Sequence, residues 1–362
     1  MPASPLTPPA TDPTPIFEIF RGNHGTELLT AAVAHLNVFG RLADGALESE
    51  ALRQELGLSP RAAVVLFTAL VAMGLVERDR QGRLAATPLA REHLAPGGEF
   101  YVGDYVGLAA GSPGVLAMVE RLRSSRPPGG EPDEAGAAFI YREGIRSAMD
   151  QAESARHLTL SLAGRGKNVA PVLAERVPLD GAKLLVDVGG GSGIYSAAFL
   201  RRYPQLRAVV WDRPEVLKVA DEFARQYGVA ERLECLGGDM FADPLPEGAD
   251  AVLLSNVLHD WDWPECQRLV NRCAEALPPG GRLLIHDVFL SDAHDGPLPI
   301  ALYSAALFSL TEGRAYSAAE FRQMLAAAGL SPANEIVPTL IHCGVLVGVK
   351  GDLARSKSLA TK

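Results

Sequence analysis

The chain has 362 residues, more than one average domain, so two folded units are expected. It carries 34 Lys and Arg against 43 Asp and Glu, a formal net charge of -9, which argues against a surface built to bind nucleic acid or anionic lipid. The four cysteines show no CxxC spacing, which argues against a zinc site or a disulfide framework and is typical of reduced thiols in a cytoplasmic protein.

The first fifteen residues are rich in Pro, Ala and Thr. They lack the basic start and the apolar segment of a signal peptide, so residues 1–15 are expected to be a disordered lead-in. No uninterrupted apolar run is long enough to span a bilayer. We therefore expect no membrane segment and a cytoplasmic location, with residues 351–362 as a flexible tail.

Residues 16–110 predict helices, a turn and a hairpin in the order of a winged helix. Leucines and valines recur at helical spacings over residues 16–39, and a short polar helix follows near residue 48. Ser59 can cap, and Pro60 can open, a helix running to Met73. Residues 75–84 then predict a hairpin. A winged helix can bind DNA, but the helix that would enter the major groove, which begins at Pro60, offers one cation, Arg61. We therefore expect the winged helix to pair two subunits, and a transcription regulator is a lesser alternative.

Residues 111–167 predict connecting helices that help to cover the active site. From residue 168 to 350 short β-branched runs alternate with helical stretches, which indicates a mostly parallel sheet covered on both faces. The expected strands are Leu184–Val188, Ala208–Trp211, Ala251–Leu254, Leu283–Val288 and Val345–Val349, with the last two strands of the sheet near Glu335–Pro338 and Ile341–Lys350.

A glycine-rich turn follows the first of these strands. Gly189, Gly191 and Gly193 form a GxGxG pattern, with Asp187 two residues ahead of it and a helix expected from Ser192. Glycines let the backbone approach a ligand, and the helix N-terminus favours an anionic group. The dinucleotide fingerprint GxGxxG is not matched. The turn instead resembles the first motif of class I methyltransferases, a resemblance that places the methionine carboxylate of S-adenosylmethionine near this loop.

Two further acids follow at strand ends. Asp212 stands about 20 residues on, where an acid can accept hydrogen bonds from ribose hydroxyls of an adenosyl or nicotinamide cofactor. Asp239 and Met240 resemble the methyltransferase motif in which the acid meets the adenine amino group and the next residue packs on the ring. Asp212 as a mere helix cap and Met240 as ordinary core remain alternatives. Phe241 completes this part of the expected donor site.

His259 lies after the fourth strand, just before a helix that Asp262 can cap. Methyl transfer to a hydroxyl needs alignment and removal of a proton, and a histidine can take that proton near neutral pH. A phenol, with a pKa of about 10, is a poor nucleophile without such a base. The alternative for His259 is a loop histidine whose side chain bonds a carbonyl.

The string His259-Asp260-Trp261 resembles the catalytic loop of plant and bacterial small-molecule O-methyltransferases of the caffeic-acid and hydroxyindole type. The resemblance implies a seven-stranded class I methyltransferase domain, an N-terminal winged-helix dimerisation domain, S-adenosylmethionine as methyl donor, and His259 as general base. It places an orienting acid at Asp287. The family's second acid is replaced by Ala315, so Asp287 alone or with Asp260 must orient the base, and the family's lysine in the donor site is replaced by Ser255.

The predicted function is therefore methyl transfer from S-adenosylmethionine to a hydroxyl of a small aromatic acceptor, by a homodimer without a metal. Candidate pocket residues, each equally compatible with the core, are Phe139, Tyr141, Met149, Tyr303 and Phe308. A C-methyltransferase of the same fold, and a relative that binds the donor but does not transfer methyl, remain alternatives.

Overall fold

The computed structural model describes residues 6–125 and 152–351, which form two compact units. The sheet unit comprises residues 6–15, 152–289 and 318–351, and the helical unit comprises residues 16–125 and 290–317. Compared with the expected domain borders, residues 152–167 belong with the sheet, and residues 290–317 belong with the N-terminal helices. The reason is packing: one long helix runs through residue 176 against the sheet's own helices, and residues 298–310 pack on the N-terminal helices.

The sheet unit contains a seven-strand path in the order β10-β11-β7-β6-β3-β4-β5. The central pairs β3–β4, β3–β6, β4–β5 and β6–β7 are parallel, and β11 runs antiparallel to β7. β10 and β9 each pair with β11. The strands are β3 (Leu184–Val188), β4 (Arg207–Asp212), β5 (Leu233–Gly237), β6 (Ala251–Ser255), β7 (Arg282–Leu290), β9 (Leu330–Pro332), β10 (Val337–Pro338) and β11 (Cys343–Lys350).

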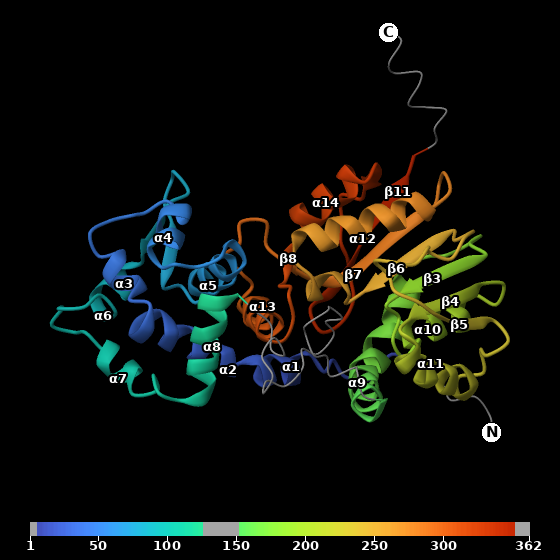
Figure 1. Ribbon diagram of the computed structural model, residues 1–362, viewed down its shortest axis with the longest axis horizontal. Helices are drawn as coiled ribbons and strands as arrows, with labels where there is room; N and C mark the ends of the chain where they lie inside the picture. The colour runs from blue at the N-terminus through green and yellow to red at the C-terminus, as the bar shows by residue number, and fades with distance from the viewer. Residues whose placement is uncertain (1–5, 126–151, 352–362) are drawn as a thin grey trace, which may run out of the picture. The chain divides into compact units, whose positions relative to one another are not determined.

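Helices cover both faces of this sheet (Figure 1). On one face α9, α10 and α11 pack together, and on the other α12 packs with α14. The central strands are buried on both faces, as their uninterrupted apolar runs predict. The helical elements are α9 (Ala152–Arg176), α10 (Ile194–Arg202), α11 (Pro214–Gln226), the 3-10 turn η3 (Leu258–Asp260), α12 (Trp263–Ala276) and α14 (Ala318–Ala327).

The helical unit contains the expected helix, turn, helix and hairpin. Ser59 caps α5 by accepting a hydrogen bond from the Ala62 amide at 3.2 Å, and Pro60 is its first residue. The two strands β1 and β2 pair in antiparallel register. The elements are α1 (Thr14–Arg21), α2 (Asn23–Thr30), the π-helical turn η1 (Ala31–His35), α3 (Val38–Arg41), α4 (Ser49–Glu55), α5 (Pro60–Ala72), β1 (Val76–Arg78), β2 (Leu84–Ala86), α6 (Pro88–His93), α7 (Gly103–Gly107), α8 (Pro113–Ser124), α13 (Leu298–Leu310) and β8 (Tyr316–Ser317).

Arg61, the cation that a DNA-reading α5 would need, is buried inside the helical unit. Its guanidinium donates to the carbonyl oxygens of Ser125 at 2.6 Å and of Thr311 at 3.2 Å, and it lies over the Phe308 ring at 4.8 Å. A side chain held in this way cannot reach a phosphate, so the arrangement does not favour DNA binding by this helix.

Across residues 6–125 and 152–351, no single helix has the length and apolar composition needed to cross a membrane. The bent pair α4 and α5 meets these limits only when taken together, with 112° between its halves, and most of α5 is buried.

Candidate active site

The turn after β3 requires glycine for two separate reasons. Gly189, Gly191 and Gly193 have positive φ of 65°, 55° and 66°, a region that disfavours side chains with a Cβ. At Gly190 a Cβ would stand 2.7 Å from the Asp187 carboxyl carbon, so space forbids it there. Helix α10 begins immediately after Gly193, slightly later than the sequence predicts. The turn therefore brings bare backbone amides to the carboxyl edge of the sheet, beside a helix N-terminus.

Two acids hold this turn from within. Asp187 is fully buried, and the Ser196 hydroxyl donates to its Oδ2 at 2.7 Å. Burial raises the pKa of Asp187 to about 7, even though the Ser196 hydrogen bond opposes that rise. Asp212, at the end of β4, accepts from the Gly191 amide at 2.7 Å and from the Arg213 amide at 2.7 Å. Asp212 is thus more than the helix cap that the sequence left as an alternative.

Asp212 is partly exposed, and its apolar surroundings still raise its pKa to about 6. Its carboxylate already contacts the glycine turn, so a ligand lying in that turn would meet it. A carboxylate at this strand end can accept from the two hydroxyls of a ribose.

Asp239, after β5, is joined to the same edge by Arg213. The Arg213 guanidinium lies 3.2 Å from Asp239 Oδ2, while the Arg213 main chain bonds Asp212. Asp239 Oδ1 accepts from the Phe241 amide at 2.8 Å, and the Met240 side chain is partly exposed. Sequence reasoning placed both acids correctly at strand ends and missed Arg213, which had no motif to mark it.

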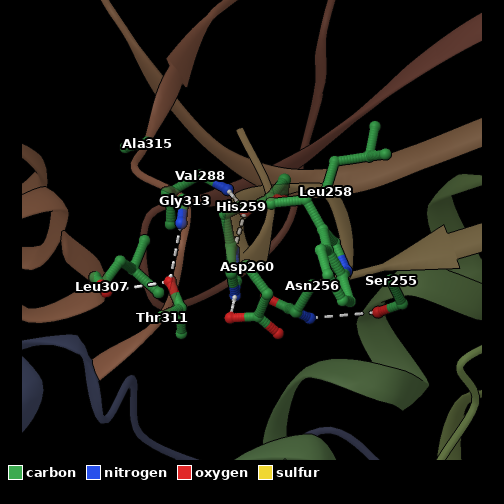
Figure 2. A network of polar contacts seen from close by, with 12 residues as sticks. Ser255, Asn256, Leu258, His259, Asp260, Val288, Leu307, Thr311, Gly313 and Ala315 are labelled. Carbon is green, nitrogen blue, oxygen red and sulfur yellow. Dashed lines mark hydrogen bonds and ion pairs between the residues drawn. The ribbon is translucent and has the colours of Figure 1, made fainter. Parts of the chain in front are cut away.

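His259 sits in the 3-10 turn after β6 and is almost completely buried. Its Nδ1 lies 2.6 Å from Asp287 Oδ1 on β7. Its Nε2 lies 3.8 Å from Asp260 Oδ1 (Figure 2). The Val288 amide also donates to Asp287 Oδ1 at 2.8 Å. Asp287 is therefore the acid that fixes the imidazole, and Asp260 is a more distant neighbour on the other side of the ring.

The surroundings of His259 act on its pKa in opposite directions. Burial alone would lower the pKa, but the charges of Asp287 and Asp260, with the Asp287 hydrogen bond, outweigh burial and raise it above 6.5. Burial raises the pKa of Asp260 to about 7, so this acid is protonated more readily than an exposed one.

Ser255 and Asn256 precede the histidine turn and form a polar cluster with β7. The Ser255 hydroxyl lies 2.8 Å from His286 Nδ1, and Asn256 Nδ2 donates to that hydroxyl at 3.1 Å (Figure 2). His286 Nε2 lies 3.1 Å from the Thr339 hydroxyl, and burial lowers the pKa of His286 to about 3. His286 and Asp287 thus serve different partners, as strand alternation predicts.

Of the residues predicted to line an aromatic pocket, those that the structure describes do not lie in the sheet unit with the glycine turn and His259. Phe139, Tyr141 and Met149 lie outside the described residues. Tyr303 and Phe308 belong to α13 of the helical unit, where Phe308 is fully buried and the Tyr303 ring lies 3.6 Å below the Arg21 guanidinium.

Ala315, at the position of the family's second acid, is buried in the helical unit. Its amide donates to the Ser304 hydroxyl at 3.1 Å. Four residues upstream, the Thr311 hydroxyl donates to the Leu307 carbonyl and accepts from the Gly313 amide (Figure 2). The methyl side chain of Ala315 carries no charge, so the family's second acid has no counterpart at this position.

In the described part of the chain no group of three or more His, Cys, Asp or Glu side chains is arranged to hold a metal ion. The geometry therefore consists of a glycine turn, two strand-end acids and a buried histidine–aspartate pair along one edge of one sheet. Such an arrangement can bind a nucleoside and take a proton beside it.

Comparison with known proteins agrees with this geometry. The 3-hydroxy-5-methyl-1-naphthoate 3-O-methyltransferase of Streptomyces sahachiroi is 36% identical over 350 residues, which cover 95% of this chain and 97% of that enzyme. The crystal structure of an O-methyltransferase family 2 protein from Planctomyces limnophilus, in complex with apigenin, is 50% identical with a TM-score of 0.87, over 97% of this chain and all of that one.

Human N-acetylserotonin methyltransferase, solved in complex with SAM, is 23% identical with a TM-score of 0.57, over 93% of this chain and 97% of that one. At that identity the likeness concerns the fold, and it confirms the predicted class I methyltransferase architecture. A family model described as an O-methyltransferase domain matches residues 143–331, just over half of the chain. Together with the 36% identity across nearly the whole length, this match establishes that the chain belongs to the O-methyltransferase family.

Proposed function

We propose that this protein transfers a methyl group from S-adenosylmethionine to a hydroxyl of a small aromatic acceptor, with His259 as the general base. The observation that carries the proposal is the buried pair of His259 Nδ1 and Asp287 Oδ1 at 2.6 Å, on the same sheet edge as the glycine turn. An orienting acid behind a histidine at a ligand-binding edge is the arrangement that proton removal requires.

The donor site is supported by residues of the sheet unit alone. The positive φ at Gly189, Gly191 and Gly193 shapes a turn without side chains, and the amides of this turn lie at the start of α10. The contact of Asp212 with the glycine turn supports its role as acceptor of the ribose hydroxyls, and the resemblance to the family's adenine motif supports that role for Asp239 and Met240. S-adenosylmethionine supplies an activated methyl group on a sulfonium, so the protein has only to align the acceptor and remove its proton.

His259 performs that removal through Nε2. The carboxylate of Asp287 accepts the Nδ1 proton, which fixes the tautomer and leaves the Nε2 lone pair as the proton acceptor. When Nε2 takes the hydroxyl proton, the charge of the imidazolium is stabilised by Asp287 at 2.6 Å. The oxygen that remains is the nucleophile, and a phenol is the acceptor for which such a base matters most, because its pKa is about 10.

The acceptor class is supported by the named relatives. The Streptomyces sahachiroi enzyme acts on a hydroxynaphthoate, and the Planctomyces limnophilus protein was solved with apigenin. We extend this class to the present chain and propose that its acceptor is a hydroxylated aromatic compound.

We also propose a homodimer paired through the helical unit, which is supported by the exposed apolar side chains Ile16, Ile19 and Phe20 of α1.

The direct test is incubation with S-adenosylmethionine carrying an isotope-labelled methyl group and a panel of phenols, followed by mass spectrometry and NMR of the product. We expect label on oxygen of an aromatic acceptor. Label on carbon would identify a C-methyltransferase, and binding of the donor without transfer to any acceptor would favour a relative with other chemistry.

Asp287→Asn should change the pH profile as well as the rate. His259 acts when neutral, so activity rises as pH passes its pKa, which Asp287 helps to hold above 6.5. Removing that charge lowers the pKa, so the rising limb of kcat against pH moves to lower pH. The maximal rate should fall about 10- to 100-fold, because one charge-assisted hydrogen bond to the developing imidazolium is lost.

Steady-state kinetics between pH 5 and 9 measure both effects. Asp180→Asn, an exposed acid of the same unit, is the matched control and should leave the profile in place. A rising limb that stays at the wild-type pH in Asp287→Asn would contradict the assignment of His259 as the titrating base.

A further inference from the structure

The glycine turn and the histidine loop carry no cationic side chain of their own, although a donor with an amino acid part presents a carboxylate. The methionine part of S-adenosylmethionine bears a carboxylate, whereas the groups that hold the glycine turn, Asp187 and Asp212, are themselves acids. Neither the turn at 189–194 nor the loop at 255–259 contains a Lys or Arg, and the family's lysine is Ser255 here. The amides of the turn can donate to this carboxylate, but a cationic partner for it has to come from another element.

Arg165 of α9 reaches this region. Its Nη1 donates to Asn256 Oδ1 at 2.8 Å, and Asn256 Nδ2 in turn donates to the Ser255 hydroxyl at 3.1 Å. The guanidinium is therefore linked through one amide side chain to the position where the family carries its lysine. The charge of Arg165 also acts on the pKa values of His259 and His286, which places it electrostatically beside the active-site loop.

A second contact places the same stretch of α9 beside the glycine turn. Gly166 is buried against Ile194, the first residue of α10, and a Cβ on Gly166 would lie 2.6 Å from Ile194 Cγ2. The backbone next to Arg165 thus touches the helix that begins where the turn ends. Arg165 therefore has Gly166 on one side, which packs near the turn, and Asn256 of the histidine loop on the other.

Asn256 is itself held firmly. It is a non-glycine residue with a positive φ of 56°, its amide donates to the His286 carbonyl at 2.8 Å, and its side chain also contacts the Tyr195 hydroxyl at 3.4 Å. A residue in this conformation needs such support. The Asn256 side chain can therefore orient the Arg165 guanidinium as a fixed fork.

A second contact of the Arg165 guanidinium is with a weak acceptor. Its Nη2 donates to Cys343 Sγ at 2.9 Å, and a thiol sulfur is a poor acceptor compared with a carboxylate. We propose that Arg165 binds the carboxylate of the methionine part of S-adenosylmethionine, exchanging the thiol for it and taking the place of the lysine that this chain lacks. This inference rests on the proposed function and names a binding residue for its donor.

Calorimetric titration separates Arg165 from the rest of the donor site. S-adenosylhomocysteine carries the carboxylate, whereas 5′-methylthioadenosine has the same nucleoside and thioether without the amino acid. In Arg165→Gln, which removes the charge, we expect the Kd for S-adenosylhomocysteine to rise about 10- to 100-fold and the Kd for 5′-methylthioadenosine to stay unchanged. Arg165→Lys, which keeps the charge, should recover part of the loss.

Lys167→Gln is the matched control, because Lys167 is an exposed cation on the same helix, lying over the Phe223 ring at 5.2 Å. It should bind both compounds as the wild type does. An equal loss for both compounds in Arg165→Gln would show a structural role and overturn the proposal, and so would unchanged binding of S-adenosylhomocysteine. Failure of the wild type to bind S-adenosylhomocysteine would instead overturn the proposed function.

Discussion

Replacement of His259 by asparagine is expected to lower kcat by about 10²- to 10⁴-fold, the contribution that a positioned general base makes to proton transfer. Asparagine can keep the hydrogen bond that Nδ1 donates to Asp287, so the fold of the turn is retained. What disappears is the basic Nε2 atom. The donor Kd should stay near the wild-type value, because His259 is assigned to the acceptor's proton and not to the nucleoside.

Single-turnover kinetics with saturating donor and acceptor measure this loss directly. His157→Asn, which removes an exposed histidine from α9, is the matched control and should turn over normally. A further check uses an acceptor whose hydroxyl is already ionised at the assay pH. Such an acceptor needs no base, so His259→Asn should recover much of the wild-type rate with it. Turnover close to wild type with a neutral phenol would exclude His259 as the base.

Replacement of Asp212 by alanine should weaken donor binding by about 100-fold or more. Two hydrogen bonds from ribose hydroxyls to a carboxylate are lost, each contributing about 1.5–3 kcal/mol. The variant also loses the acceptor of the Gly191 amide, so the glycine turn is less well ordered before the ligand binds. Because the pKa of Asp212 is raised to about 6, wild-type affinity should itself decline as pH falls below that value and the carboxylate is protonated.

Calorimetry with S-adenosylhomocysteine at pH 5 and pH 8 tests both statements. Asp212→Asn keeps one acceptor oxygen and should bind with intermediate affinity. Asp221→Ala removes an exposed acid that lies 3.4 Å from Arg225 on α11, and it serves as the control for charge. Binding by Asp212→Ala equal to that of the wild type would remove Asp212 from the ribose site.

Much of the architecture could be predicted because its signals are local. The runs at Leu184–Val188 and Ala251–Leu254 were recognisable as buried strands from continuous apolar residues, and the structure extends them by at most one residue. Asp262 and Ser59 marked two helix starts, because a cap and its partner lie within a few residues of each other. Positive φ at the glycine turn was likewise foreseeable, since only glycine occupies that region freely.

Other features depended on contacts between distant segments. The family resemblance placed the orienting acid at Asp287, and the sequence left open whether Asp260 also orients His259. The parallel register of β6 and β7, which sets Ser255 beside His286, brings Asp287 to 2.6 Å from Nδ1, while Asp260 remains 3.8 Å from Nε2. Register is decided by the packing of whole strands, so it cannot be inferred from the residues around a single motif.

The same distinction explains the two arginines. From the sequence, Arg61 was the one cation of a possible DNA-reading helix, and Arg165 carried no motif at all. The folded chain buries Arg61 against Thr311, and it carries Arg165 along α9 to Asn256, 91 residues away. Spacing along the chain determined which elements form and which edge of the sheet carries the glycine turn and the acids. Tertiary packing alone decided which charges meet, because a long side chain's partner depends on where distant elements come together.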